Sequence, residues 1–375
     1  MFHHKNMKVA LVHESLTRLG GAERVLEQMH RLYPDAPIYA LLHEISVTKN
    51  LFPNANLHFS FLRRFPEFLR KRERLFLPLL PVVPETFDLS RYDVVISSAS
   101  AFAKGVVTRP GTVHICYCHS PTRYLWDWYP HVLEEFGGGS LKYGILSILL
   151  HYLRLWDQSA SRRVDFFVAN SNATAGRIRK YYGRDSDVIY PPVNMNRFMP
   201  TKENKGYFLI VSRLSPYKKI DVAIHAFNKL ELPLVIVGEG RDRERLQGIA
   251  GQSVTFRGFV NDDKLPDLYA GARAVIFPGE DDFGIVPVEA MASGKPVIAL
   301  RRGGATETVV EGVTGELFDE PHEAILAEAV RGFIEKENTY DYLKIRERAE
   351  LYSEENFKKN LEEYVESKWK AWQNR

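Results

Sequence analysis

Short, almost continuously apolar runs recur along the chain, and a helical pattern follows them. After the first run, for example, Val25, Met29 and Leu32 have the spacing of an amphipathic helix. Apolar runs without polar alternation are typical of parallel strands whose two faces are both covered. The repeat of strand, turn and helix therefore predicts a doubly wound α/β structure. The runs are KVALVHE (8–14), DVVISSAS (93–100), VHICYCHS (113–120), DFFVANS (165–171), GYFLIVSRL (206–214), PLVIVGEG (233–240), VTFRGFV (254–260), AVIFPGE (274–280) and PVIAL (296–300).

The chain of 375 residues is long enough for two domains. Residues 190–206 are rich in Pro, Asn and charge, which is typical of a linker. We therefore expect two Rossmann-like domains, residues 1–198 and 199–355, that face a cleft. The last segment, 356–375, carries apolar side chains at helical spacing, and we expect it to pack back on the first domain. Those side chains are Phe357, Leu361, Val365, Trp369 and Trp372.

The composition argues against several classes of protein. The formal net charge is only +3, so no overall field favours nucleic acid, and we expect none as a partner. Cys116 and Cys118 do not make a disulfide framework, which suits a reducing cytosol. The first residues lack the apolar core of a signal peptide, and His151 and Arg154 interrupt the longest apolar stretch, 143–156. We expect a cytoplasmic protein that is soluble or peripheral on a membrane.

Ligands of open α/β sheets bind beyond the carboxyl ends of the strands, so the residues that follow each predicted strand have the most weight. Gly20 and Gly21 follow the first strand and precede a helix. Without a Cβ they let a ligand approach the backbone, and the start of the helix offers unpaired N–H groups to an anion. A plain glycine turn is the alternative. The pattern is not G-x-G-x-x-G, which argues against a dinucleotide site.

Three cations follow the first strand of the second half. Arg213 ends this strand, and Lys218 and Lys219 stand just before the next helix. A planar guanidinium and an ammonium together suit two adjacent phosphates. A solvated basic loop is the alternative. Together with the glycine turn of the other domain, these cations favour a diphosphate in the predicted cleft.

Three consecutive carboxylates, Glu280, Asp281 and Asp282, fill the loop after the strand AVIFPGE. Glu289 follows in what we predict to be the first turn of the next helix. Because an unpaired buried carboxylate is costly, these acids are either solvated or hold a ligand rich in hydroxyls. Glu289 could simply complement the helix dipole. It could also accept two hydrogen bonds from a ribose, while Asp281 and the Gly284 backbone hold sugar hydroxyls.

These segments together resemble the retaining GT-B glycosyltransferases of family 4, which include bacterial mannosyl- and glucosyltransferases of surface polysaccharides. The resemblance covers nearly all of the chain, and CYCHSPTRYLWD (116–127) is most similar to the O-antigen mannosyltransferase type. The resemblance implies a GT-B fold with two Rossmann-like domains. The segments that carry it are GGAER (20–24), SRLSPYKKID (212–221), VGEG (237–240), RGFV (257–260), DDFGIVPVEAMASGKPVIA (281–299), GGATE (303–307) and GVTGELF (312–318).

The resemblance also implies roles for single residues. Residues 1–198 would be the acceptor-side domain and 199–355 the nucleotide-sugar donor domain. His119 would bond a sugar hydroxyl near the reacting carbon, and Arg213 and Lys218 would bind the pyrophosphate. The implied donor-binding set is Gly20 and Gly21 against the phosphates or the sugar, the Val260 backbone at the base, Glu289 at the ribose, and Gly238, Glu280, Phe283, Gly284, Ile285 and Val286 around them.

One position departs from the family pattern. The family usually has a Glu eight positions before Glu289, where this chain has Asp281. Glu280 stands one position too early, and Asp282 fills a place usually taken by Gly. We place Asp281 in the catalytic set with the histidine and the two cations. Because its side chain is one methylene shorter, it stays open whether Glu280 or Asp281 reaches the sugar.

The resemblance implies the transfer, with retention, of mannose or glucose from a nucleoside diphosphate sugar, such as GDP-mannose or UDP-glucose, to a growing surface glycan. Arg213, Lys218 and helix N-termini would neutralise the leaving diphosphate, so no metal or other cofactor is expected. A sugar-nucleotide epimerase on the same fold is one alternative. A non-catalytic nucleotide- or glycan-binding module is another.

Two patterns suggest metal sites, and neither is favoured. The pairs Asp281–Asp282 and Asp262–Asp263 carry ligands that Mg²⁺ or Mn²⁺ could use. The run HICYCH (114–119) suggests zinc through its histidines and cysteines. However, alternate residues of a strand point to one face, and C-x-C lacks the spacing of a structural zinc site. We expect two buried thiols on this strand.

Residues 61–81, FLRRFPEFLRKRERLFLPLLP, combine Phe and Leu with many basic side chains. This segment is either a solvated helix that packs partly into the core or an interfacial segment on anionic lipid. The second interpretation suits an acceptor glycan on a polyprenyl diphosphate carrier, at the inner face of the plasma membrane. The basic residues are Arg63, Arg64, Arg70, Lys71, Arg72 and Arg74.

Overall fold

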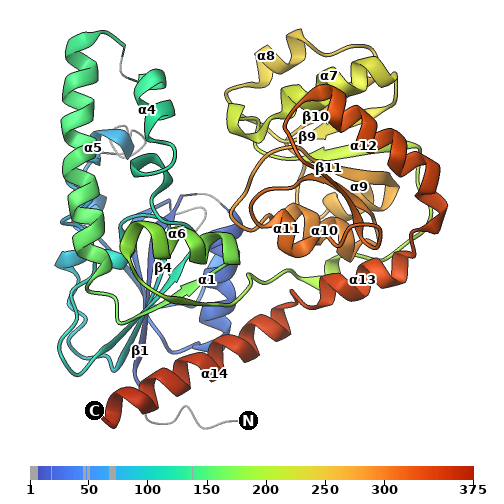
Figure 1. Cartoon of the computed structure of the whole chain (residues 1–375). Helices are drawn as coiled ribbons and strands as arrows, with labels where there is room; N and C mark the ends of the chain where they lie inside the picture. The colour runs from blue at the N-terminus through green and yellow to red at the C-terminus, as the bar shows by residue number, and fades with distance from the viewer. Residues whose placement is uncertain (1–6, 18, 45–47, 49–50, 67–72, 137) are drawn as a thin grey trace. The chain divides into compact units, whose positions relative to one another are not determined.

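The computed structural model of the chain describes residues 7–17, 19–44, 48, 51–66, 73–136 and 138–375 (Figure 1). The chain forms two compact units, which we call unit 1 (Met1–Tyr190 and Phe357–Arg375) and unit 2 (Pro191–Asn356). Each unit contains one parallel sheet with helices around it, which confirms the predicted class of two doubly wound, Rossmann-like halves. None of the described helices combines the length and apolar composition needed to cross a bilayer.

The sheet of unit 1 has seven strands in the order β3-β2-β1-β4-β5-β6-β7, and all neighbouring strands are parallel. Apolar side chains of β1, β4, β5 and β6 alternate between two apolar clusters, one on each face of the sheet. All residues of β4 and β5 are buried, including the free thiols of Cys116 and Cys118, as expected. The strands are β1 (Val9–Leu16), β2 (Ile38–His43), β3 (Leu57–Phe59), β4 (Val94–Ala99), β5 (Val113–Cys118), β6 (Phe166–Ala169) and β7 (Ser186–Val188).

Different helices cover the two faces of this sheet. Leu26 of α1 (Gly21–Leu32) and Leu361 of α14 (Glu354–Gln373) belong to the cluster on one face. The cluster on the other face includes residues of α4, α5 and α6. These helices are α4 (Tyr129–Phe136), α5 (Ser140–Ser161) and α6 (Asn172–Tyr182), and short 3₁₀ turns η1 (Phe61–Arg64), η2 (Glu73–Phe76), η3 (Pro84–Thr86), η4 (Ala103–Gly105) and η5 (Arg123–Leu125) connect elements of this unit.

Unit 2 has the same kind of fold, with a six-stranded parallel sheet in the order β10-β9-β8-β11-β12-β13. Its strands are β8 (Tyr207–Val211), β9 (Leu234–Val237), β10 (Val254–Gly258), β11 (Ala272–Phe277), β12 (Val297–Leu300) and β13 (Gly315–Phe318). Its helices are α7 (Ile220–Leu230), α8 (Arg243–Gly248), α9 (Leu265–Gly271), α10 (Ile285–Ala292), α11 (Ala305–Thr308), α12 (Glu323–Lys336) and α13 (Tyr342–Glu350), with 3₁₀ turns η6 (Met195–Arg197), η7 (Pro216–Lys218) and η8 (Glu337–Thr339).

The basic segment 61–81 is not a continuous helix, so the helical interpretation of it was wrong. The chain forms η1, then η2, and then turns from Leu77 to Val83. Pro66, Pro78 and Pro81 explain this, because proline lacks the N–H of a helix interior and clashes with the preceding turn. Arg70, Lys71 and Arg72 lie outside the described residues.

The packing of α14 against unit 1 generates a prediction about stability. Leu361 is fully buried among apolar side chains. We expect Leu361→Ala to lower the free energy of unfolding of unit 1 by about 2–5 kcal/mol, because it leaves a cavity. Urea titration, with circular dichroism as the readout, measures this free energy of unfolding. Glu363→Ala, on the exposed side of the same helix, is the control, and equal stability of the two variants would contradict the packing.

Candidate active site

The strand order of unit 1 reverses between β1 and β4, where open α/β sheets leave a crevice for a ligand. Polar side chains meet at this place. His13 comes from β1, Ser98 from β4 and His119 from the residue after β5. Ser98 Oγ lies 3.0 Å from His13 Nδ1 and 2.8 Å from His119 Nε2. A hydroxyl thus links the two imidazoles into one hydrogen-bonded chain.

Burial determines the protonation state of the His119 ring. Burial, together with the neighbouring His13 ring, lowers the pKa of His119 to about 3, so His119 is neutral at physiological pH. Ser98 has one hydroxyl hydrogen and can donate it to only one of the rings, so the other ring donates its N–H to Ser98. His13 Nε2 is buried and has no hydrogen-bond partner among the described residues. A buried polar atom without a partner at a strand end suits a ligand site.

Glu23, in the segment GGAER, completes this cluster. Its Oε1 lies 3.7 Å from His13 Nε2. Burial would raise the pKa of Glu23, but the interaction with His13 outweighs burial and holds this pKa below its ordinary value. A Cβ on Gly20 would lie 2.9 Å from Glu23 Oε2, so the glycine lets the carboxylate fold over the start of α1. A carboxylate here attracts hydroxyl donors and repels phosphate.

Two further carboxylates hold the loops that carry these side chains. Glu14 Oε1 accepts three backbone N–H bonds, of 2.7–3.2 Å, from the loop after β4. Asp157 of α5 is fully buried and forms an ion pair of 2.5 Å with Lys104 in the same region. Its other donors are Thr122, Trp126 and Tyr182. These contacts, several of them buried, fix the exits of β4 and β5 in place.

The strand order of unit 2 reverses between β8 and β11, and Lys218 and Asp281 meet there. Lys218 belongs to η7, after β8, and Asp281 to the loop after β11. Lys218 Nζ lies 2.5 Å from both carboxylate oxygens, and the two side chains are 14% and 24% exposed. Burial disfavours the ammonium, but the Asp281 carboxylate outweighs burial and raises the pKa of Lys218 above its ordinary value. The Lys218 ammonium is therefore charged at neutral pH.

The loops after β8, β11 and β12 touch one another through glycines. A Cβ on Gly279 would lie 2.8 Å from the Cα of Lys218. A Cβ on Gly303, where φ is +60°, would lie 2.1 Å from the backbone oxygen of Asp281. The Gly304 N–H donates to that oxygen at 3.0 Å. Only glycine permits this approach, which fixes Asp281 against Lys218.

Glu289 does not lie in the first turn of its helix, so that prediction was wrong. The helix α10 begins at Ile285, because Gly284, with φ of +84°, ends the preceding loop and leads into it. Glu289 is thus one turn further in, where a role as a simple dipole partner is weak. It is 5% exposed, and its Oε2 accepts a hydrogen bond of 2.8 Å from the Tyr269 hydroxyl.

The other predicted residues of unit 2 lie after strands of the same parallel sheet. Arg213 is exposed after β8, Gly238 follows β9, and Val260, half-buried, follows β10. Glu280 is half-buried beside Asp281. Because all strands of this sheet are parallel, these exits share one edge of it.

The predicted residues at the start of α10 can offer mainly backbone groups. Ile285 and Val286 are its first two residues, whose N–H groups have no partner within the helix. Phe283 is 3% exposed, and its ring packs against Tyr352 at a centroid distance of 5.5 Å. Its side chain therefore belongs to the core, and only its backbone could contact a ligand.

Sequence reasoning assigned no role to His13, Ser98 or Glu23. The available signal was the polar residue at the end of each apolar run, HES after the first and SSAS after the second. That signal does not say which polar residues meet. His13 and Ser98 are 85 positions apart and are joined only by the pairing of β1 with β4.

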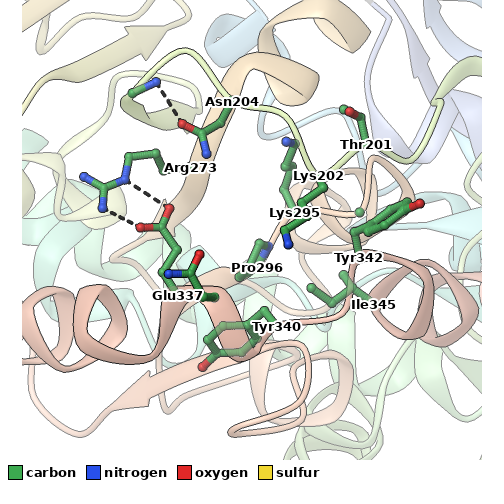
Figure 2. A pocket seen from close by; sticks show the side chains of 13 residues that line it. Thr201, Lys202, Asn204, Arg273, Lys295, Pro296, Glu337, Tyr340, Tyr342 and Ile345 are labelled. Carbon is green, nitrogen blue, oxygen red and sulfur yellow. Dashed lines mark hydrogen bonds and ion pairs between the residues drawn. The ribbon is translucent and has the colours of Figure 1, made fainter.

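A pocket of about 400 Å³ in unit 2 lies away from all of these residues (Figure 2). Arg273 is the second residue of β11, and Lys295 and Pro296 precede β12, so the pocket is at the amino ends of the strands. The side chain of Arg273 is held there by an ion pair with Glu337. None of the predicted site residues lines this pocket, and it is therefore not the predicted donor site.

Two doubly wound, Rossmann-like units in one chain are the architecture of the GT-B class of α/β proteins. Comparison with family models agrees. Residues 19–197 match the model described as Glycosyltransferase Family 4, and residues 194–350 match Glycosyl transferases group 1. Together the two models account for most of the chain, which is a member of the family 4 glycosyltransferases with the GT-B fold.

Curated relatives resemble part of the chain. Human alpha-1,3/1,6-mannosyltransferase ALG2 is 29% identical over 54% of this chain and 58% of its own length. The lipopolysaccharide 1,2-N-acetylglucosaminetransferase of Salmonella typhimurium is 30% identical over 47% of this chain and 52% of its own. D-inositol 3-phosphate glycosyltransferase of Streptomyces scabiei is 28% identical over 46% of each. The chain thus spans about half of the length of these curated relatives.

Solved structures resemble nearly the whole chain. HepE of Anabaena, in complex with UDP, has a TM-score of 0.71 over 96% of this chain and 100% of its own, at 19% identity. The lipopolysaccharide outer core galactosyltransferase WaaB, in its apo form, has a TM-score of 0.67 over the same shares, at 18% identity. At such identities these similarities establish the fold.

The buried histidine chain generates a prediction about protonation. Because its pKa is about 3, the His119 ring should stay neutral between pH 8 and 5. A histidine in the unfolded chain titrates near ~6.5, so protons bind the unfolded state better and the free energy of unfolding falls as pH drops below that value. Imidazole ¹H–¹⁵N NMR measures the protonation state of His119 as a function of pH, and the His119→Gln variant assigns its signal. A midpoint near ~6.5 would contradict the buried hydrogen-bonded ring.

Proposed function

We propose that this protein is a retaining hexosyltransferase that moves mannose or glucose from a nucleoside diphosphate sugar to a growing surface polysaccharide. The observation that carries the proposal is the place of Lys218, Asp281 and Arg213, which gather at the carboxyl ends of β8 and β11. Ligands of such sheets bind there, and fixed cations are what a diphosphate requires.

The donor diphosphate is assigned to unit 2. Arg213 is exposed and offers a planar fork of N–H donors, and Lys218 is held ionised by Asp281. The first N–H groups of α10, at Ile285 and Val286, add the positive end of a helix. We assign Glu289 to the ribose, the Val260 backbone to the base and the Gly238 turn to the nucleotide side.

The sugar is assigned to carboxylates and to the neutral imidazole of His119. In unit 1, Glu23 beside Gly20 and Gly21 suits hydroxyl donors, and neutral His119 can bond a sugar hydroxyl without adding charge near the reacting carbon. In unit 2, Asp281 is already engaged by Lys218. We therefore assign the direct contact of that loop with the sugar to Glu280, and to Asp281 the task of orienting Lys218.

The chemical step follows from these assignments. The acceptor hydroxyl forms a bond to the anomeric carbon on the face that the diphosphate leaves, and the bond from that carbon to the phosphate oxygen breaks. The acceptor proton passes to the departing phosphate, so no protein base is required. Arg213, Lys218 and the start of α10 stabilise the charge that develops on the diphosphate. The product keeps the anomeric configuration of the donor, which NMR of the product reads directly.

We infer that the reaction needs no metal ion. An ammonium 2.5 Å from both oxygens of Asp281 occupies the place that a divalent cation would take on this carboxylate. The two protein cations and the helix N–H groups supply the positive charge that a metal supplies elsewhere. Full activity in the presence of a chelator is the expected result.

The similar proteins use different sugars, so they do not identify the sugar or the acceptor of this chain. HepE has been crystallised with UDP-glucose, and the human relative is a mannosyltransferase. We favour the O-antigen mannosyltransferase type because of the segment 116–127, with GDP-mannose as the first donor to test. We propose as acceptor a glycan on a polyprenyl diphosphate lipid, and a peripheral position on the cytoplasmic face of the plasma membrane.

The assignment of the cations is tested by substitution. We expect Arg213→Ala and Lys218→Ala each to lower kcat by about 100-fold or more, because each removes a donor to the leaving diphosphate. A thermal-shift screen first selects the nucleotide sugar that stabilises the protein. Release of the nucleoside diphosphate then reports the rate.

Lys344→Ala, which removes an exposed cation of α13 in the same unit, is the matched control and should leave the rate unchanged. Turnover near that of the control in both variants, with folding intact, would reject the proposed diphosphate site. Conversion of the free sugar nucleotide without any acceptor would point instead to an epimerase.

A further inference from the structure

The helix α5 carries a continuous apolar stripe that no described residue covers. Its exposed side chains recur at intervals of four and three residues, which places them on one face of the helix. They are 51–76% exposed, with Leu141 and Ile148 at the upper end of this range. We call this set the α5 apolar face; it comprises Leu141, Ile145, Ile148, Tyr152 and Leu155.

The opposite face of α5 is the one that builds the core. Leu150 and Leu153 are buried in the same apolar cluster as Leu133 of α4, and α4 lies beside α5 (Figure 1). Asp157 further fixes the helix through its ion pair with Lys104. The buried face alone therefore anchors α5 in unit 1. Core packing does not explain why the outer face is apolar.

Single exposed apolar residues are normal, but five large ones in one stripe are not. The α5 helix is about 33 Å long at 1.5 Å per residue, and the stripe runs over most of it. Such a surface marks contact with a membrane or with another protein. Tyr152, and Tyr143 nearby, add amphipathic rings of the kind that favour the membrane–water interface.

Charge decides between a bilayer and a second copy of the chain. Apart from its tyrosines, the exposed titratable side chains on α5 are Lys142 and His151, and its single acid, Asp157, is buried against Lys104. In a pair of α5 helices the flanks would be neutral or basic on both sides, so no interhelical ion pair could form. Anionic headgroups would complement this edge instead.

The same layer of unit 1 offers a second exposed apolar stretch. Leu75, Leu79 and Val82 are 43–56% exposed, while their neighbours Phe76 and Leu80 are buried in the cluster that holds Leu150 of α5. Both exposed stretches therefore belong to the layer that covers one face of the sheet. The exposed Arg63 and Arg64 precede the second stretch in the chain.

We propose that the α5 apolar face docks on an anionic lipid bilayer, with α5 lying in the plane of the headgroups. This inference deepens the peripheral position given under the proposed function, and rests on it for its purpose, which is to bring the enzyme to a lipid-linked acceptor. The docking surface lies outside the residues assigned to the sugar nucleotide. The test of membrane docking therefore needs no measurement of turnover. The docking proposal can fail while the proposed reaction holds.

The experiment is flotation of the full chain with vesicles of phosphatidylcholine that contain or lack phosphatidylglycerol, at low salt. We expect the wild-type chain to float with the anionic vesicles. Replacing both Ile145 and Ile148 by Glu should lower the bound fraction by about tenfold or more, because two inserted apolar side chains are lost. The matched control replaces Leu343 and Leu351 by Glu, which are exposed to similar extents in unit 2.

Three results would overturn the proposal. One is a wild-type chain that does not float, and another is a double variant that floats like the control. The third is a wild-type dimer, seen by light scattering, that the α5 substitutions convert to monomers, since that would assign the face to a second copy. Unchanged circular dichroism and unchanged affinity for a nucleoside diphosphate show that the variants are folded, and they keep this test separate from that of the reaction.

Discussion

A parallel strand that is covered on both faces has no room along its length for a solvated polar side chain, and this constraint organises the whole molecule. Polar groups are pushed to the strand ends, and the reversal of strand order decides at which ends a ligand can fit. Unit 1 reverses between β1 and β4, where His13 and Ser98 meet. Unit 2 reverses between β8 and β11, where Lys218 and Asp281 meet. Each candidate cluster thus lies where its sheet leaves a crevice.

The two clusters differ in charge in a way that matches the two parts of a sugar nucleotide. Unit 1 gathers two imidazoles, a hydroxyl and a carboxylate, Glu23, which suit sugar hydroxyls and disfavour phosphate. Unit 2 gathers Lys218 and the exposed Arg213, which suit a diphosphate. Burial keeps His119 neutral, whereas the Asp281 carboxylate keeps Lys218 charged against the effect of burial. The chemistry proposed for each cluster therefore follows from its surroundings rather than from residue type alone.

Much of the fold could be predicted from the sequence, because apolar runs and turn residues are local signals. The strands that were overlooked, β3 and β7 among them, are short and lie at sheet edges or carry polar residues. The site was predictable only in part. Resemblance pointed to Lys218 and Asp281, but their ion pair joins residues 63 positions apart. The position of Glu289 within α10 depended on the conformation of Gly284, and the uncovered stripe on α5 could not be separated from core residues by spacing alone, because both faces of that helix are apolar.

In the proposed reaction, fixed protein cations, and not a metal ion, meet the charge of a sugar-bearing diphosphate. A crystal structure of the chain with a nucleoside diphosphate sugar, grown in the presence of a chelator, tests it most directly. We expect diphosphate oxygens within hydrogen-bonding distance of Lys218 Nζ and the Arg213 guanidinium, beside the start of α10. A diphosphate that binds elsewhere, or one that is seen only when a divalent cation bridges it to Asp281, would contradict the role of these cations.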